Sequence, residues 1–289
     1  MSIRVGIQLY SVRNSLMKDP FGTLDKLAEI GYKYIEAANH DTTKDPGVGF
    51  GLSADEMKQA LERLGLSIVG CHVNPLDPAS LERVLDYHAE LGNPQIGCAI
   101  EFFPYNDVDY VLKKCELFNQ IGEMCRARGM RFYYHNHYQE FQAFGDKTVY
   151  DIIMENTDPS LVFIEMDTYW IMRGGQDPVE LIRKYKDRLV LIHQKDFPKD
   201  APQPLNMYDG IINKSAEINM DVFAATINPL CFTEIGTGVL PIQDIINAAA
   251  EAPNVDYIIL EQDATQLGEI ESIRTSMEAF RKFTGIAWK

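Results

Sequence analysis

Short apolar runs alternate with helix-like segments along the whole sequence, and this alternation constrains the fold more than any other feature. The apolar runs, each predicted to be a β-strand, cover residues 3–10, 33–37, 66–73, 95–100, 132–135, 161–167, 189–193 and 256–261. Segments with apolar residues at helical spacing lie between and after them. These predicted helices cover residues 21–30, 53–64, 80–91, 108–128, 147–156, 177–186, 241–252 and 268–283.

Eight strands that alternate with eight helices predict a closed parallel barrel. The strands are continuously apolar, as expected where both faces of a parallel sheet are buried. We therefore expect an α/β protein with a (β/α)8 TIM barrel in one domain, residues 1–289. A doubly wound open sheet is the alternative architecture. Such a sheet would carry a glycine-rich phosphate turn after its first strand, and GIQLYSVR contains no G-x-G-x-x-G.

Charge and cysteine content limit the partners. The net charge of −15 repels polyanions, which argues against nucleic acid and acidic membrane surfaces. The five cysteines are scattered and never form a CxxC pair, which indicates reduced thiols in a cytoplasmic protein. The N-terminal residues do not resemble a signal peptide, and no apolar run approaches the roughly 20 residues that span a bilayer.

Polar, titratable side chains follow most of the predicted strands. The active sites of TIM barrels lie at the carboxyl ends of the strands. The residues at these ends are His72, Asn74, Glu101, His135, His137, Glu140, Asp167, His193, Lys195, Asp196, Glu261 and Asp263. A single residue of this kind would more often be a solvated or capping group. Asp167, His193 and Glu261, each at the end of its own strand, together predict a site for Mn²⁺, Co²⁺, Mg²⁺ or Zn²⁺.

Several longer segments carry a resemblance to a known family. They are GIQLYSVR, YYHNHYQEF, EMDTYWIMRGGQDPVELIRKY, DRLVLIHQKDF, TEIGTGVLPIQDII and YIILEQD. With these segments the chain resembles the xylose-isomerase-like superfamily of TIM barrels, which includes sugar phosphate isomerases/epimerases, inosose isomerases and ketose 3-epimerases. The resemblance implies one divalent metal ion, held by residues from strands five to eight. Asp167, His193 and Glu261 match the last three ligand positions.

The ligand from strand five departs from the family pattern. Many relatives have a glutamate roughly where His135 stands, and the nearest carboxylate here is Glu140, five residues later. Glu140 is our expected fourth ligand, because a third anionic oxygen suits a hard ion such as Mn²⁺. Coordination by His135, or a rearranged site, is the alternative.

The resemblance implies a metal-dependent isomerase or epimerase that removes a proton next to the carbonyl of a sugar, keto-sugar or inosose, with the enediolate stabilised by the metal. A lyase or deglycosylating subunit acting on keto-glycosides, or a non-catalytic sugar-binding barrel, is the alternative. His137 is the expected base, because imidazole titrates near neutral pH. Further expected catalytic residues are His135, Lys195 and Glu261, and the expected substrate-binding residues are Tyr10, His72, Trp170 and Arg173.

The substrate is expected to be an unphosphorylated sugar, polyol or keto-glycoside. A phosphate group would require a cluster of cationic side chains, and only Lys195 and Lys199 are evident near strands seven and eight. Residues 195–237 form a long irregular segment, and loops of this length in compact domains are usually functional or disordered. This segment is expected to be a lid or a contact of a homo-oligomer.

Overall fold

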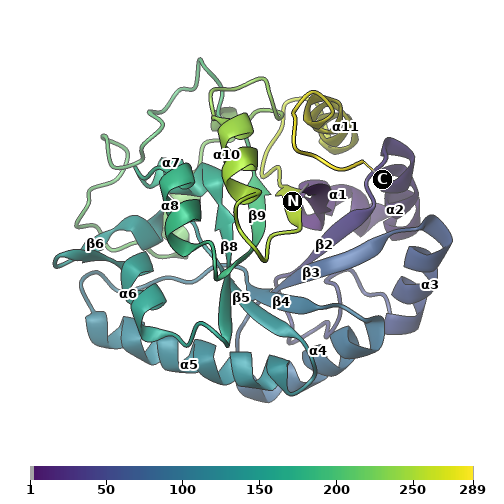
Figure 1. Cartoon of the computed structure of the whole chain (residues 1–289), viewed down its shortest axis with the longest axis horizontal. Helices are drawn as coiled ribbons and strands as arrows, with labels where there is room; N and C mark the ends of the chain where they lie inside the picture. Colours follow the sequence, from purple (N-terminus) through teal and green to yellow (C-terminus); the bar gives the residue numbers. More distant parts are fainter. Residues whose placement is uncertain (1–2, 289) are drawn as a thin grey trace.

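A closed barrel of eight parallel strands forms the centre of the molecule, as the computed structural model shows for residues 3–288 (Figure 1). Around the barrel the strands are β1 (Arg4–Gln8), β10 (Tyr257–Leu260), β9 (Leu189–Gln194), β8 (Val162–Asp167), β5 (Arg131–His135), β4 (Gln95–Cys98), β3 (Ser67–Val73) and β2 (Tyr34–Asn39). The predicted TIM barrel is confirmed. The predicted domain range, 1–289, includes residues 1, 2 and 289, which lie outside the described part.

A layer of helices surrounds the barrel, and each lies within or close to a predicted segment (Figure 1). These helices are α2 (Pro20–Ile30), α3 (Ala54–Leu64), α4 (Pro78–Leu91), α5 (Val108–Arg126), α6 (Val149–Asn156), α8 (Pro178–Tyr185), α10 (Ile242–Ala249) and α11 (Glu269–Phe280). Capping residues fix where several of these helices begin and end, as helix α3 illustrates. Helix α3 begins at a capping box between Ser53 and Glu56 and ends at Gly65, which is left-handed.

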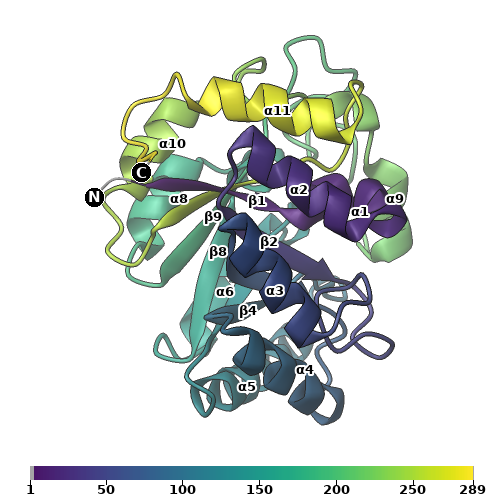
Figure 2. The same ribbon diagram turned by 90° about the vertical axis from the view of Figure 1, so that its right-hand side faces the viewer.

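Short elements that the periodicity did not predict lie mostly after the strands, near their carboxyl ends. They are η1 (Leu9–Val12), α1 (Arg13–Lys18), η2 (Gln139–Phe141), β6 (Ala143–Phe144), β7 (Lys147–Thr148), α7 (Thr168–Arg173), α9 (Met220–Thr226) and η3 (Pro229–Cys231). Figure 2 shows α1 and α9 at the same end of the barrel. Residues 195–237 are otherwise irregular, as predicted, and they contain α9 and η3.

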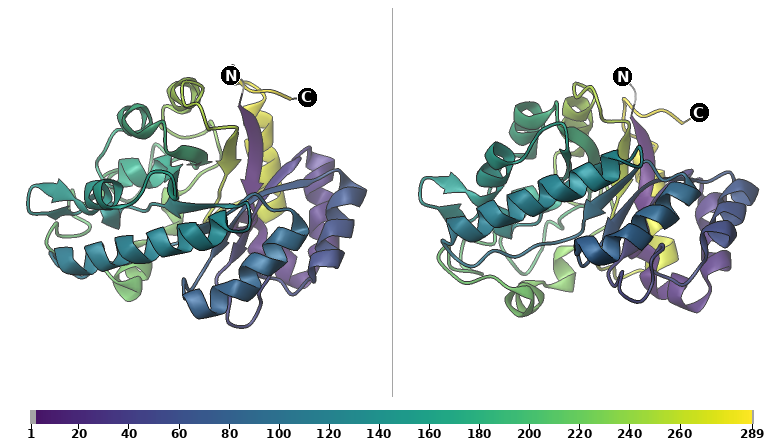
Figure 3. Two further views of the ribbon diagram at one scale, coloured as in Figure 1. Left: turned by 60° about the horizontal axis from the view of Figure 1, so that its bottom comes forward. Right: turned by 90° about the horizontal axis from the view of Figure 1, so that it is seen from below.

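The two ends of the described chain meet at the opposite end of the barrel (Figure 3). The Ile3 N–H donates to the Gly285 carbonyl at 3.0 Å, and the Ala287 N–H donates to the Ile3 carbonyl at 2.8 Å. The last residues therefore close the barrel beside the start of β1. Among residues 3–288, no helix combines the length and the apolar character that a membrane span requires.

Alternate strand residues point into the barrel and stack in layers. In the middle layer the Tyr133 ring crosses the interior, and its hydroxyl donates to Glu36 on β2. The ring lies where a Cβ on Gly97 of β4 would be, so a glycine is required there. His135, Asp167 and His193 lie at or next to the carboxyl ends of β5, β8 and β9, and they belong to the site described next.

Candidate active site

Four buried side chains converge at the carboxyl ends of adjacent strands: His135 of β5, Asp167 of β8, His193 of β9 and Glu261 just after β10. One potential ligand atom from each lies within 4.8 Å of those of the others. His193 Nδ1 is 2.9 Å from Glu261 Oε2, and His135 Nε2 is 3.5 Å from Asp167 Oδ2. This buried His/Asp/Glu group, called the upper group below, has the donor set of a divalent metal site.

The hydrogen bonding of His135 fits a metal ligand. Its Nδ1 is 3.0 Å from the Ala99 carbonyl, so Nδ1 carries the proton and donates it. Its Nε2 is buried and has no hydrogen-bond partner. Burial lowers the pKa of His135, which favours the neutral ring. A lone pair on Nε2 therefore faces the Asp167 carboxylate, an arrangement that a cation between the two would stabilise.

Lys195 supplies a positive charge to the upper group. Its buried ammonium donates to Asp167 Oδ2 and Glu261 Oε2 and lies 3.8 Å from Asp263 Oδ1. Burial opposes the charge, but these three carboxylates raise the pKa of Lys195 well above its usual value. Lys195 thus neutralises the two carboxylates that a metal ion would use.

A second set of buried polar residues, Glu36, His72 and Glu165, adjoins the upper group. His72 and Glu165, together with His135 and His193, form another group whose potential ligand atoms lie within 4.8 Å of one another. His193 Nε2 is 2.5 Å from Glu36 Oε2 and 3.0 Å from Glu165 Oε1, while His72 Nε2 is 2.6 Å from Glu165 Oε2. Burial opposes the charge on His193, but Glu165, Glu261 and Glu36 raise its pKa well above the usual value. The Nε2–H of His193 therefore points to the carboxylates of Glu36 and Glu165, and its Nδ1 faces the upper group.

Sequence reasoning missed Glu36 and Glu165, although a signal existed for one of them. Glu165 lies two residues before Asp167 on the same strand, and the two-residue period of a strand places both on one face. Glu36 lies inside an apolar run on β2, on the far side of the barrel from β8. Only the closed barrel brings Glu36 to His193.

We expect Glu36→Gln to weaken divalent metal binding by roughly 10- to 100-fold, the range seen when partners of metal ligands are changed. The substitution keeps the side-chain shape but removes the charge that orients the His193 ring. Competition with a chelator measures the affinity. Glu101→Gln is the matched control, because Glu101 pairs with Lys114 outside both groups. Equal affinities for the two variants would contradict the orienting role.

Glu140, the expected fourth ligand, lies apart from both groups. Its carboxylate accepts hydrogen bonds from the Tyr134 hydroxyl at 2.7 Å and from the His137 N–H at 2.8 Å. Tyr134 follows the inward-facing Tyr133 and so points outward, where it packs on Phe118 of α5 with ring centroids 5.2 Å apart. The carboxylate of Glu140 therefore faces the outer side of β5, and the structure brings His135 into the upper group instead.

Because the Glu140 carboxyl group is buried, we expect the free energy of unfolding of the protein to depend on pH. Burial raises its pKa from 4.5 to about 7, so folding favours the protonated acid. Relative to Glu140→Gln, wild-type stability should be constant below pH 4.5 and should fall as the pH rises to about 7. The total loss should be up to about 3 kcal/mol, at 1.36 kcal/mol per pH unit. Urea unfolding of both proteins between pH 4 and 8 measures it, and parallel profiles would show that the acid is not perturbed.

A pocket of about 420 Å³ opens above the upper group. Two lining residues, His72 and His135, belong to barrel strands. The segments that follow the strands contribute Tyr10, His40, His137, Trp170, Glu261 and Asp263, and α9 and the residue after it contribute Met220, Phe223, Ala224 and Ile227. The size is that of a small-molecule site. No arginine or lysine of the described chain lines it.

Aromatic contacts hold α9 against the pocket. The Phe223 ring stacks on Tyr138 with centroids 5.6 Å apart and an interplanar angle of 8°, and it meets the edge of His137 at 5.2 Å. The ring centroids of Trp170 and His137 lie 5.4 Å apart. Burial lowers the pKa of His137 well below its usual value, with a contribution from His135, and His137 Nδ1 is buried without a partner.

Among the predicted substrate-binding residues, Tyr10, His72 and Trp170 line this pocket, and Arg173 does not. The guanidinium of Arg173 is buried at the end of α7 and donates to the carbonyls of Pro204 at 2.5 Å and Leu205 at 3.2 Å. It also donates to the side chain of Gln203 at 2.6 Å. Arg173 therefore anchors the 195–237 segment to the barrel.

The sequence matches the family described as "Xylose isomerase-like TIM barrel" over residues 24–283. The chain belongs to this family. Family membership agrees with the closed barrel and with the resemblance seen in the sequence.

Relatives and solved structures extend the comparison. An inosose dehydratase of Clostridium tetani is 27% identical over 157 residues, which are 53% of this chain and 48% of that protein. The chain thus spans about half the length of this curated relative. A sugar phosphate isomerase/epimerase of Parabacteroides distasonis has a similar structure, with a TM-score of 0.75, 20% identity and coverage of 99% and 96% of the two chains. The IOLI protein, solved with a bound zinc atom, has a TM-score of 0.65 at 12% identity, with 96% of each chain covered.

Proposed function

We propose that the protein is a divalent-metal-dependent isomerase or epimerase that removes a proton next to the carbonyl of a sugar, keto-sugar or inosose. The observation that supports this most strongly is the upper group at the floor of a small-molecule pocket. The name of the Parabacteroides structure, sugar phosphate isomerase/epimerase, points to the same class of reaction.

In this proposal His135, Asp167, His193 and Glu261 hold one divalent ion. His135 takes the place that the sequence analysis gave to Glu140, because its free Nε2 faces Asp167. Two carboxylates and two imidazoles suit Mn²⁺, our first choice, as well as Co²⁺ and Zn²⁺, and Mg²⁺ is the least favoured because it prefers oxygen ligands. A related barrel of known structure contains zinc. When bound, the ion would supply positive charge that polarises a substrate carbonyl.

Residues in and around the pocket are proposed to move the proton, hold the substrate and exclude water. His137 is proposed as the base, because its Nδ1 is buried, has no partner and belongs to a residue that lines the pocket. The substrate then regains a proton, on the neighbouring carbon in an isomerase or on the opposite face of the same carbon in an epimerase. Trp170 is proposed to pack against the substrate ring. Lys195, which is buried below the pocket lining, is proposed to support the reaction indirectly by holding the carboxylates of Asp167 and Glu261 in place. Helix α9 would exclude water from the reacting carbon.

The lining of the pocket favours an unphosphorylated substrate, since none of its described residues is an arginine or lysine. A dehydratase is the second candidate, and the curated relatives favour it because the Clostridium tetani protein is named inosose dehydratase. Elimination begins with the same proton abstraction and ends with the loss of a leaving group on the next carbon. The same scheme covers a lyase that acts on keto-glycosides.

Deuterium incorporation tests the proposal. Protein loaded with Mn²⁺ is incubated in D₂O with a panel of keto-sugars and inososes, and the products are followed by NMR. We expect deuterium at the carbon next to the carbonyl, its loss after chelation, and its return with added metal. An elimination product would identify the dehydratase. Failure of every compound to exchange with fully loaded protein would favour a non-catalytic sugar-binding barrel.

A further inference from the structure

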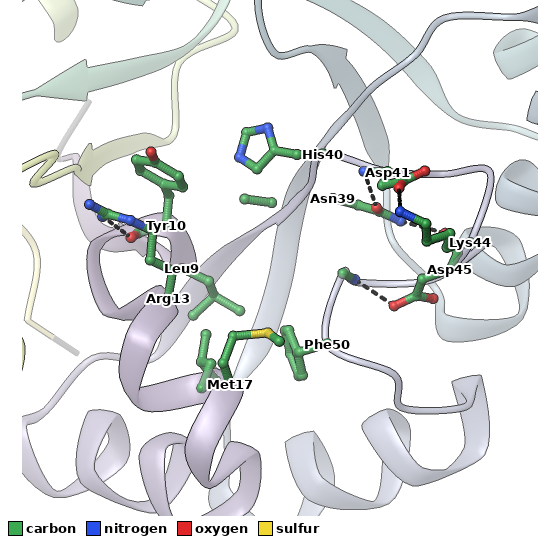
Figure 4. A pocket seen from close by; sticks show the side chains of 13 residues that line it. Leu9, Tyr10, Arg13, Met17, Asn39, His40, Asp41, Lys44, Asp45 and Phe50 are labelled. Carbon is green, nitrogen blue, oxygen red and sulfur yellow. Dashed lines mark hydrogen bonds and ion pairs between the residues drawn. The ribbon is translucent and has the colours of Figure 1, made fainter. Parts of the chain in front are cut away.

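A second pocket of about 390 Å³ lies beside the active-site pocket, between the segments that follow β1 and β2 (Figure 4). Tyr10 and His40 line both pockets. Their rings meet edge to face with centroids 5.2 Å apart. The two pockets therefore share a wall made of these two aromatic rings.

One side of the second pocket is apolar. It is built by Leu9 and Leu16, which are buried, and by Met17 and Phe50. In Figure 4 the side chain of Met17 extends toward Phe50. Met17 is 72% exposed, the highest value among the large apolar side chains of residues 3–288. An apolar ligand group would gain free energy by covering this side.

The charged groups of the second pocket already have partners. The Arg13 guanidinium donates to the carbonyls of Tyr10 at 2.8 Å and Asp263 at 2.7 Å. Lys44 pairs with Asp41 at 2.6 Å. The Asp45 carboxylate accepts hydrogen bonds from three backbone N–H groups of its own loop. These charged side chains thus all contact other groups of the protein, and the side of the pocket formed by Leu9, Leu16, Met17 and Phe50 suits an uncharged, apolar ligand group.

We propose that this pocket binds an uncharged apolar substituent, aryl or alkyl, of a substrate whose sugar ring occupies the active-site pocket. The proposal rests on the proposed function for the sugar ring, and it adds a glycoside-like substrate class to it. Phe50 and Met17 are the residues that would determine the preference for the substituent. The sharing of Tyr10 and His40 places the bond between sugar and substituent beside these two rings.

Binding without turnover tests the subsite. Phenyl β-D-glucopyranoside and methyl β-D-glucopyranoside are titrated into metal-loaded and metal-free protein, and their affinities are measured by ligand-observed NMR. We expect the phenyl compound to bind at least about tenfold more tightly than the methyl compound. Phe50→Ala should reduce this preference to about threefold or less. Met17→Ala, a change of an exposed residue that leaves the fold intact, should reduce it in the same direction.

Phe21→Ala is the matched control, because Phe21 is 41% exposed and lines neither pocket. It should keep the wild-type preference. Equal affinities of the two glucosides, no binding of the phenyl compound, or an unchanged preference in both Phe50→Ala and Met17→Ala would overturn the subsite. Because binding is measured without turnover, a negative deuterium experiment alone would count against the proposed reaction and not against the subsite.

Discussion

If Asp167 is a metal ligand, as proposed, purified Asp167→Asn protein is expected to fail to retain a divalent ion. It should also lose at least about a hundredfold of the deuterium-exchange activity, because changing a direct ligand should matter more than changing the partners of ligands. The backbone N–H of Trp170 donates to Asp167 Oδ1 at 2.9 Å at the start of α7, and the asparagine side chain keeps an oxygen that can accept this hydrogen bond. It removes the negative charge from the upper group. The fold should therefore survive. Elemental analysis of the dialysed protein measures the metal, and circular dichroism checks the fold.

The comparison of His135→Gln with Glu140→Gln identifies the fourth ligand. Both residues are buried and follow one another closely in sequence, but only His135 lies in the upper group. We expect His135→Gln to lose metal and Glu140→Gln to retain it. The reverse result would restore the expectation from the family pattern and remove His135 from the ligand set.

Lys195→Met is expected to destabilise the metal-free protein by about 3–5 kcal/mol, the usual cost of removing one partner from a buried ion pair. The substitution leaves the carboxylates of Asp167 and Glu261 without their cation. A divalent ion should replace the lost charge, so saturating Mn²⁺ should restore most of the stability. Chemical unfolding with and without Mn²⁺ measures both effects.

The same variant should bind metal more tightly than the wild type, since the ammonium competes for the oxygens that the ion would use. Lys114→Met is the control, because Lys114 pairs with Glu101 outside both groups. Its stability loss should be smaller and should not respond to Mn²⁺. If Lys195→Met lost the same stability with and without Mn²⁺, the carboxylates around Lys195 would not be metal ligands.

The sequence predicted the barrel because its signals are local and repeated. Continuous apolar runs, helical spacing and caps such as Ser53 with Glu56 recur along the chain. The strand-end rule also brought Asp167, His193 and Glu261 together, since parallel strands present their carboxyl ends at one side. The rule does not apply to residues beyond the end of a strand. Glu140 lies five residues after the end of β5, and its carboxylate faces the outer side of that strand.

The rest of the site depends on contacts between distant segments. Helix α9 has only seven residues, too few for a clear periodic signal, and it is held by the ring contacts of Phe223. Arg173 looked like a substrate-binding cation in the sequence, but the carbonyls of the 195–237 segment use its donors. Neither arrangement can be inferred without knowing where that long segment returns to the barrel.

The packing of Tyr133 against Gly97 has a consequence for the evolution of the family. A methyl group on Gly97 would overlap the Tyr133 ring, and that ring carries the hydroxyl that reaches Glu36. Positions 97 and 133 therefore compete for the same space, and positions 133 and 36 are joined by a hydrogen bond across the barrel. Among homologues they should covary, with a larger residue at position 97 found together with a smaller one at 133 and a different partner at 36, because isolated changes would overpack the interior or leave a buried carboxylate unsatisfied.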